Sequence, residues 1–313
     1  MKIALIGPGI MPIPPPGWGA VEILIWDYYN ELINQGHDVT IINTKSMLEI
    51  VSKVNAGGFD FVHLHYDVFY PVLDHLKCPK IAITSHYPYI DQLDKHIKDG
   101  YTNVFHFLVK QTRYFNFVLA DKDYQTFLNY GADPARLKKI KNGIDSKSFM
   151  FEEKAKYSKC TYLGKVTPRK NQNKYQYLPN IDFVGNVDDP NFNRKHPNYL
   201  GEWTRDKIHK ELTFYTNLLL ISQGEADPLV VKEALIAGLG VIVNKSSSEN
   251  LDTTKAFITV LDDSRLDDLE YVYTKIQENM AICATNRHMI RKYGVEAFDI
   301  GLEVKKYVEL LEQ

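Results

Sequence analysis

The sequence has few cysteines and lacks a long apolar stretch. Its 313 residues include three cysteines, Cys78, Cys160 and Cys283, an odd and scattered set without a C-x-x-C pair. We therefore expect free thiols in a reducing compartment, not disulfides or a cysteine metal site. No run of about 18 apolar residues is present, so no transmembrane helix is expected. These absences favour a protein of the cytoplasm.

A strong excess of either charge is also missing. The chain has 37 Lys and Arg against 39 Asp and Glu, a net charge of −2, and residues 1–150 hold 15 of each sign. This balance excludes nucleic acid as the main partner, which usually requires a clustered basic surface. Residues 95–117 mix bases with aromatic side chains, as a membrane-interfacial surface would. We favour a buried helix with a solvated face there and keep peripheral membrane association as an alternative.

The composition that remains fits a two-domain α/β protein. A chain of 313 residues with 44% apolar and 24% charged residues can build two ordinary cores. Short apolar strands alternate with helical stretches, which predicts parallel sheets. The expected strands are 2–6, 38–42, 61–65, 80–84, 116–120, 159–163, 181–184, 218–222 and 241–243, and the clearest helices are 21–35, 124–129 and 229–237. A charged segment, 146–158, predicts a linker between domains 1–150 and 155–294.

Two glutamates eight positions apart form the most informative motif. Glu225 stands in a loop after an apolar strand, and Glu233 in a helix that opens at about Pro228 and stops at Gly238. Glu225 should lie at the helix N-terminus and Glu233 roughly a turn and a half inside. A helix N-terminus attracts phosphate, and ionised carboxylates accept hydrogen bonds from hydroxyls. The unit therefore predicts a site for a ligand that is both sugar and phosphate.

This block resembles the E-x7-E signature of glycosyltransferase family 4. The matching positions are Ser222, Glu225, Leu229, Glu233, Ala234, Gly238, Val241 and Ile242. The resemblance implies the α/β GT-B fold: two Rossmann-like parallel-sheet domains that face each other across a cleft. It also implies a C-terminal helix, about 295–313, packed back on the first domain. The implied donor is an NDP-sugar, with UDP- or GDP-sugar favoured, and transfer retains the anomeric configuration. No metal or further cofactor is implied, and no D-x-D is placed for a metal.

A basic turn follows the first strand of the second domain. The run Gly164-Lys165-Val166-Thr167-Pro168-Arg169-Lys170 resembles the family's G-R-x-x-x-x-K, with Lys165 in the place of Arg. The resemblance assigns the donor diphosphate to Lys165 and Lys170, together with the amides near Leu229. Lysine carries a point charge and cannot make the bidentate contact that arginine makes with a diphosphate. Arg169 either makes that contact in place of Lys165 or points away from the diphosphate. A solvated basic turn is the alternative.

Two N-terminal stretches carry further candidates. Gly19 and Glu22 match a family G-G-x-E loop, with Ala20 at the second Gly, and the resemblance assigns Gly19 to the donor phosphate or acceptor. Glu22 has either a functional role or a helix-capping one. His86 follows an apolar strand, and by resemblance it contacts the donor sugar, although a satisfied loop histidine is the alternative. His63-x-His65 has the spacing of a metal pair, but no third ligand stands out.

Two strand-end glycines complete the expected site. Gly185 and Gly201 each follow a short apolar segment and resemble the loops that hold the nucleoside, although glycine after a strand is also ordinary turn chemistry. Asp227-Pro228 departs from the family pattern, because Pro removes one amide N–H and Asp adds a negative charge near the expected diphosphate. Asp227 as a helix cap is the other interpretation.

The motifs together predict a retaining glycosyltransferase. It would move a sugar from an NDP-sugar to a hydroxyl of a glycan, a lipid-linked acceptor or a small molecule. By resemblance, Glu225 and His86 hold the sugar, Lys165 and Lys170 the diphosphate, and Glu233 the ribose hydroxyls. Two alternatives stay open: a nucleotide-sugar epimerase or phosphorylase on the same architecture, and a non-catalytic binding or scaffold protein.

Overall fold

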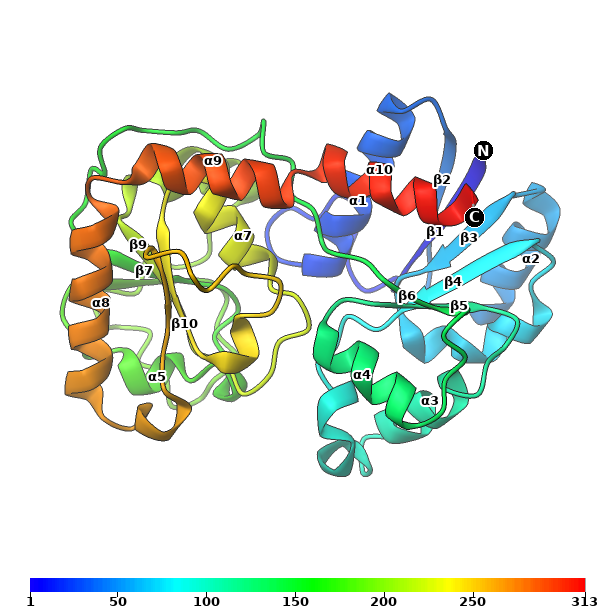
Figure 1. Cartoon of the computed structure of the whole chain (residues 1–313), viewed down its shortest axis with the longest axis horizontal. Coiled ribbons are helices and arrows are strands. Elements are labelled where there is room, and N and C mark those ends of the chain that lie inside the picture. The colour runs from blue at the N-terminus through cyan, green and yellow to red at the C-terminus, as the bar shows by residue number, and fades with distance from the viewer. Residues whose placement is uncertain (313) are drawn as a thin grey trace. The chain divides into compact units, whose positions relative to one another are not determined.

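The computed structural model describes residues 1–312, and its two parts each build a parallel sheet of their own (Figure 1). The first unit comprises Met1–Pro15, Gly19–Gly143 and the segment from Ile300 onward. The second comprises Pro16–Trp18 and Ile144–Asp299. The boundary after Gly143 lies a few residues before the predicted linker, 146–158, and the returning helix starts at Ile300, a few residues after the predicted start at about 295.

The first unit has a six-stranded sheet in the order β2-β1-β3-β4-β5-β6, and every neighbouring pair is parallel. Its strands are β1 Lys2–Gly7, β2 Asp38–Asn43, β3 Phe61–Leu64, β4 Lys80–Thr84, β5 Phe115–Val118 and β6 Leu137–Lys139. Its helices are α1 Ala20–Asn34, α2 Met47–Gly57, η1 Asp67–His75, η2 Ile90–His96, α3 Tyr101–Leu108, α4 Asp121–Asn129 and α10 Ile300–Glu312. β3 is buried along its whole length, as expected for a strand covered on both faces.

The last helix, α10, belongs to the core of the first unit and packs beside α1 (Figure 1). Its Tyr307 is 1% exposed and meets the Tyr28 ring edge-on, with the ring centroids 5.1 Å apart. The Tyr307 hydroxyl lies 2.9 Å from Nδ1 of His63 on β3. A Cβ added at Gly143 would lie 2.8 Å from the Cα of Ile300, so glycine allows the outgoing and returning segments to approach closely.

The second unit has a five-stranded parallel sheet in the order β11-β10-β9-β7-β8. The strands are β7 Cys160–Leu163, β8 Ile181–Val184, β9 Asn217–Leu220, β10 Gly240–Val243 and β11 Ile258–Val260. The helices are η3 Pro168–Lys170, α5 Gln172–Tyr175, α6 Arg205–Glu211, η4 Leu212–Phe214, α7 Leu229–Ile236, η5 Lys245–Ser247, η6 Asp263–Arg265, α8 Leu269–Cys283 and α9 Arg287–Phe298. The predicted strands and the helix at 229–237 are confirmed to within about three residues, whereas the short edge strands β6 and β11 were not predicted.

Helix α7 is buried along nearly its whole length and is held by α9. A Cβ at Gly294 would lie 2.7 Å from the nitrogen of Ile236, so this glycine permits the close approach of the two helices. Arg291 donates to the carbonyl oxygen of Ile236 at 2.7 Å, and the buried Arg287 donates to that of Ala237 at 3.5 Å. Cations at a helix C-terminus complement its dipole, so the two arginines hold the C-terminal end of α7.

Over the described residues 1–312, no helix of the protein combines the length and the apolar character needed to cross a membrane.

Candidate functional site

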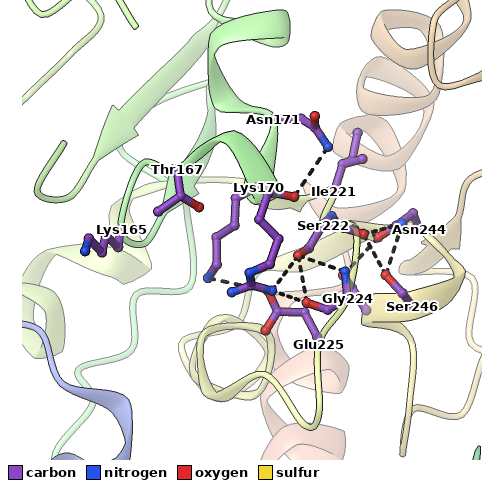
Figure 2. Close-up of polar contacts among 12 residues, drawn as sticks. Lys165, Thr167, Lys170, Asn171, Ile221, Ser222, Gly224, Glu225, Asn244 and Ser246 are labelled. Carbon is purple, nitrogen blue, oxygen red and sulfur yellow. Dashed lines mark hydrogen bonds and ion pairs between the residues drawn. The ribbon is translucent and has the colours of Figure 1, made fainter. Parts of the chain in front are cut away.

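The candidate site lies where the strand order of the second sheet reverses. β7 has β8 on one side and β9 on the other, so the loops that follow β7 and β9 leave the carboxyl edge next to each other. This switch point is where open α/β sheets bind their ligands. Figure 2 shows that the loop from Lys165 to Asn171 meets the loop from Ile221 to Glu225 there.

Glycines make the sheet edge compact enough for these loops. Gly164 and Gly185 both have a φ of +145°, and a Cβ at Gly185 would lie 2.0 Å from the Gly164 carbonyl oxygen. The nitrogen of Gly185 donates to the carbonyl oxygen of Gly201 at 2.9 Å, which places the three strand-end glycines side by side. Gly201 has a φ of +77° and open space around its Cα. Gly185 is therefore required for backbone packing whether or not it also meets a ligand.

Arg169 ties the two loops together. Its Nη1 donates to Oγ of Ser222 at 2.9 Å, to the Gly224 carbonyl oxygen, and to Oε1 of Glu225 at 3.2 Å. The carbonyl oxygen of Arg169 in turn accepts from the nitrogen of Gln223 at 2.9 Å. The Arg169 side chain therefore holds the loop of the first glutamate and contacts the same Glu225 oxygen as Lys170.

Lys170 and Glu225 form the centre of the cluster. Their charged atoms are 3.6 Å apart, and their side chains are 15% and 11% exposed. Burial alone would raise the pKa of Glu225, but the charges of Lys170 and Arg169 and the hydrogen bonds of Ser222 and Arg169 outweigh it, and the pKa lies below its ordinary value. Glu225 is therefore an ionised carboxylate at neutral pH, a group that only accepts hydrogen bonds.

Lys165 stands apart from this pair (Figure 2). Its Nζ lies 3.0 Å from Oδ2 of Asp188 and 5.4 Å from the centre of the Trp18 ring, and its side chain is 37% exposed. The two lysines of the basic motif thus have different partners, one on the acidic loop and one at the exposed rim.

Asp227 has an internal partner. Its Oδ2 lies 2.5 Å from Nζ of Lys232, and both side chains are almost fully buried. Pro228 occupies the N-cap position of α7, and Leu229 is the first residue of the helix. The carboxylate of Asp227, which departs from the family pattern, is therefore paired with a lysine of the helix that follows it.

Glu233 also pairs with a cation that the sequence did not point to. Its Oε1 lies 2.8 Å from Nη1 of Arg205, the first residue of α6, and the Glu233 side chain is 5% exposed. The two residues are 28 positions apart, and no spacing rule connects them. The Thr204 cap was the one available sign that a helix starts at Arg205.

The first unit carries a row of histidines at the ends of β3 and β4. Nδ1 of His65 lies 3.2 Å from Nε2 of His86, and the His63 and His65 ring centroids are 3.9 Å apart. Burial lowers the pKa of His86 to about 4, and burial with neighbouring histidines lowers the pKa values of His63 and His65 well below their usual range. All three are neutral at pH 7.

The His63-x-His65 pair does not have the environment of a metal site. Both nitrogens of His63 have partners, the Tyr307 hydroxyl at 2.9 Å and Oγ1 of Thr84 at 2.7 Å. Within residues 1–312, no group of three or more His, Cys, Asp or Glu is arranged to hold a metal ion.

Gly19 and Glu22 lie at the start of α1. Gly19 is the N-cap residue with a φ of +122°, and its carbonyl oxygen accepts from the nitrogen of Ile23 at 2.9 Å. Glu22 is 4% exposed, and burial raises its pKa. Of the predicted site residues, the structure brings Lys170 and Glu225 into direct contact, sets Gly185 beside Gly201, and places Gly19 and His86 in the first unit.

Comparison with known proteins identifies the fold. No family model and no curated protein matches the chain. Among solved structures it is similar to Anabaena HepE in complex with UDP-glucose, at 14% identity with a TM-score of 0.74, over 100% of this chain and 99% of that one. It is also similar to sucrose-phosphate synthase from Thermosynechococcus elongatus, at 14% identity and a TM-score of 0.76 over 100% and 98% of the chains.

A third similar structure is WaaG, described as a glycosyltransferase involved in lipopolysaccharide biosynthesis. The identity is 14% and the TM-score 0.71, over 99% of both chains. With parallel sheets of six and five strands, this chain has the GT-B fold, and the predicted fold class is confirmed.

Proposed function

We propose that this protein is a retaining glycosyltransferase that moves a sugar from an NDP-sugar to an acceptor hydroxyl. The observation that carries the proposal is the pairing of Lys170 with the ionised Glu225 at the switch point of the second sheet, in the loop that leads into α7. A cation beside a helix N-terminus suits a diphosphate, and a carboxylate that accepts hydrogen bonds from hydroxyl groups suits a sugar.

The diphosphate is assigned to the cations and to the start of α7. Lys170 and Lys165 supply positive charge, and the amides from Leu229 onward supply hydrogen-bond donors. The Asp227–Lys232 pair supports this assignment, because Asp227 no longer adds an uncompensated negative charge there. Stabilising the departing diphosphate lowers the main barrier of such a transfer.

The sugar is assigned to Glu225 and His86, and the ribose to Glu233. An ionised Glu225 accepts from sugar hydroxyls while Arg169 holds its loop. Nε2 of the neutral His86 lies 3.2 Å from Nδ1 of His65, so Nδ1 of His86 is the nitrogen assigned to a sugar hydroxyl. Gly185 and Gly201 lie beside the nucleoside in this assignment, and Gly19 lets the backbone meet the donor or the acceptor.

The proposed chemistry needs no dedicated base. The acceptor hydroxyl attacks the anomeric carbon, the bond to the diphosphate oxygen breaks, and the departing diphosphate takes the acceptor proton. We propose UDP-sugar as the first donor to test, since the HepE structure holds UDP-glucose, and GDP-sugar as the second. A metal ion and a further cofactor are not part of the proposal. The acceptor is a glycan, a lipid-linked sugar or a small molecule.

A thermal-shift panel of UDP, GDP, ADP, CMP and dTDP, with the matching NDP-sugars, tests the proposal. One diphosphate should raise the melting temperature by mass action. Lys170→Ala and Glu233→Ala should abolish the rise, while Lys292→Ala, which removes an exposed lysine on α9, should leave it unchanged. Sugar transfer to an added acceptor separates a transferase from an epimerase. A wild type that no diphosphate stabilises at millimolar concentration would contradict the proposal and favour the non-catalytic alternative.

A further inference from the structure

Arg205 stands at an unfavourable position for a cation. It is the first residue of α6, after Thr204, whose Oγ1 accepts from the nitrogen of Lys207 at 3.3 Å. A positive side chain in the first turn opposes the helix dipole. The contacts that Arg205 makes with other segments must therefore account for its position.

Two groups from other segments, together with His209 of the same helix, hold its guanidinium. Nη1 lies 2.8 Å from Oε1 of Glu233, and Nη2 lies 3.1 Å from Nε2 of His209. Its Cζ is 5.9 Å from the centre of the buried Phe149 ring. Burial, with the charge of Arg205, lowers the pKa of His209, so this histidine is neutral and accepts from Nη2. Arg205 is therefore fixed before any ligand arrives.

This arrangement engages one oxygen of Glu233 and leaves the other available. Oε1 forms the ion pair with Arg205, and among the residues that the structure describes no hydrogen bond occupies Oε2. An ionised carboxylate can accept about four hydrogen bonds. Glu233 therefore has a fixed orientation and spare acceptor capacity for two hydroxyl groups.

We propose that Arg205 is a positioning residue that makes the donor site select ribonucleotides over 2′-deoxyribonucleotides. The inference rests on the proposed function, in which Glu233 binds the ribose. Arg205 holds Glu233 in one orientation, so that the carboxylate accepts from the 2′- and 3′-hydroxyls together. Without the guanidinium, the buried Glu233 loses its ion pair and, with it, the orientation in which it accepts from both hydroxyls.

The test measures dissociation constants by calorimetry for UDP and 2′-dUDP, and for GDP and 2′-dGDP. The wild type should prefer the ribonucleotide by roughly tenfold or more, as expected for a hydrogen bond to a charged group. Arg205→Lys keeps the charge but has no fork to hold His209 and Glu233 together, and it should reduce the preference to about threefold or less. Glu233→Gln should reduce it similarly, and the double variant should lose no more than either single variant.

Arg265→Lys is the matched control, because Arg265 is an exposed arginine paired with Asp268 away from α7. It should keep the wild-type preference, and unliganded melting temperatures show which variants remain folded. A folded Arg205→Lys variant with the wild-type ribo/deoxy ratio would overturn this inference and leave the proposed function intact. A wild type that binds neither pair would overturn the proposed function, and this inference with it.

Discussion

The carboxylate of Asp227 lies 2.5 Å from the ammonium group of Lys232, and both side chains are almost fully buried. Removing one partner of a buried ion pair typically costs 3–5 kcal/mol, whereas removing both is far milder. We predict that Lys232→Met lowers the free energy of unfolding by about 3 kcal/mol or more. The double variant Asp227→Asn/Lys232→Met should recover most of that loss in urea titrations.

An exposed pair in the same unit provides the control. Lys210 and Asp206 are 2.9 Å apart on α6 with side chains 60% and 74% exposed, so Lys210→Met should change the free energy of unfolding by less than about 1 kcal/mol. Equal losses in the free energy of unfolding from Lys232→Met and Lys210→Met would show that the buried pair contributes no more to stability than the exposed pair.

The ionisation of Glu225 predicts the acid limb of the activity profile. Its pKa is below the ordinary value because Lys170 and Arg169 outweigh burial, so the ionised form persists as the pH falls. In Arg169→Met, burial is opposed by fewer charges and the pKa of Glu225 rises. We expect the acid limb of kcat/KM to move to higher pH in this variant, so that activity at pH 5.5 falls more than activity at pH 7.5.

Arg265→Met provides the comparison, since it removes an arginine that pairs with Asp268 instead. An acid limb at the same pH in wild type and Arg169→Met would show that ionised Glu225 is not needed for transfer.

The neutral histidines of the first unit predict a loss of stability in acid. The pKa of His86 is about 4 in the folded state, below the value of about 6.5 expected after unfolding. The unfolded state therefore binds the additional proton, and the free energy of unfolding falls as the pH drops below about 6.5. One such histidine contributes up to about 1.4 kcal/mol per pH unit until its folded-state pKa is reached.

Urea titrations between pH 7.5 and 4.5 measure this dependence. His86→Gln should reduce the slope, whereas His75→Gln, an exposed histidine at the end of η1, should leave it unchanged. Identical slopes for wild type and His86→Gln would contradict the assignment of a depressed pKa to His86.

We predict that replacing glycine by alanine lowers the stability by different amounts at two of the strand-end glycines. Gly185→Ala puts a Cβ 2.0 Å from the Gly164 carbonyl oxygen at a φ of +145°, so the backbone itself must shift. Gly201→Ala meets nothing within 4 Å and carries only the cost of a positive φ, about 1–2 kcal/mol. We expect the first variant to be the less stable by at least about 1 kcal/mol in urea titrations. Equal stabilities of the two variants would mean that the backbone at Gly164 shifts at little cost in free energy.

The sequence was informative where local chemistry decides the structure. Buried apolar runs located β1, β3, β7 and β9, and Pro228 with Gly238 bounded α7. The edge strands β6 and β11 were missed because each has three residues, too few for a periodicity. Such short strands form because a neighbouring strand offers free backbone groups.

Which charged side chains pair with each other could not be predicted from the sequence. The interpretation of Asp227 as a charge near the diphosphate followed from its position alone, and only folding shows that Lys232 turns back to meet it. Arg205 and Glu233 come from different helices. Arg169 and Lys170 are adjacent in sequence, and the η3 turn determines which atoms of the loop after β9 each one contacts.

The position of α10 constrains the order in which the protein folds during synthesis. Tyr307 fills the core of the first unit against Tyr28 and His63, yet it is translated after all of Ile144–Asp299. The second unit is contiguous apart from three residues and can fold as it leaves the ribosome, as domains generally do. The first unit emerges earlier but waits, with the face around Phe61 and His63 uncovered, until α10 has been made. The half of the protein that is synthesised first is thus the last to be completed.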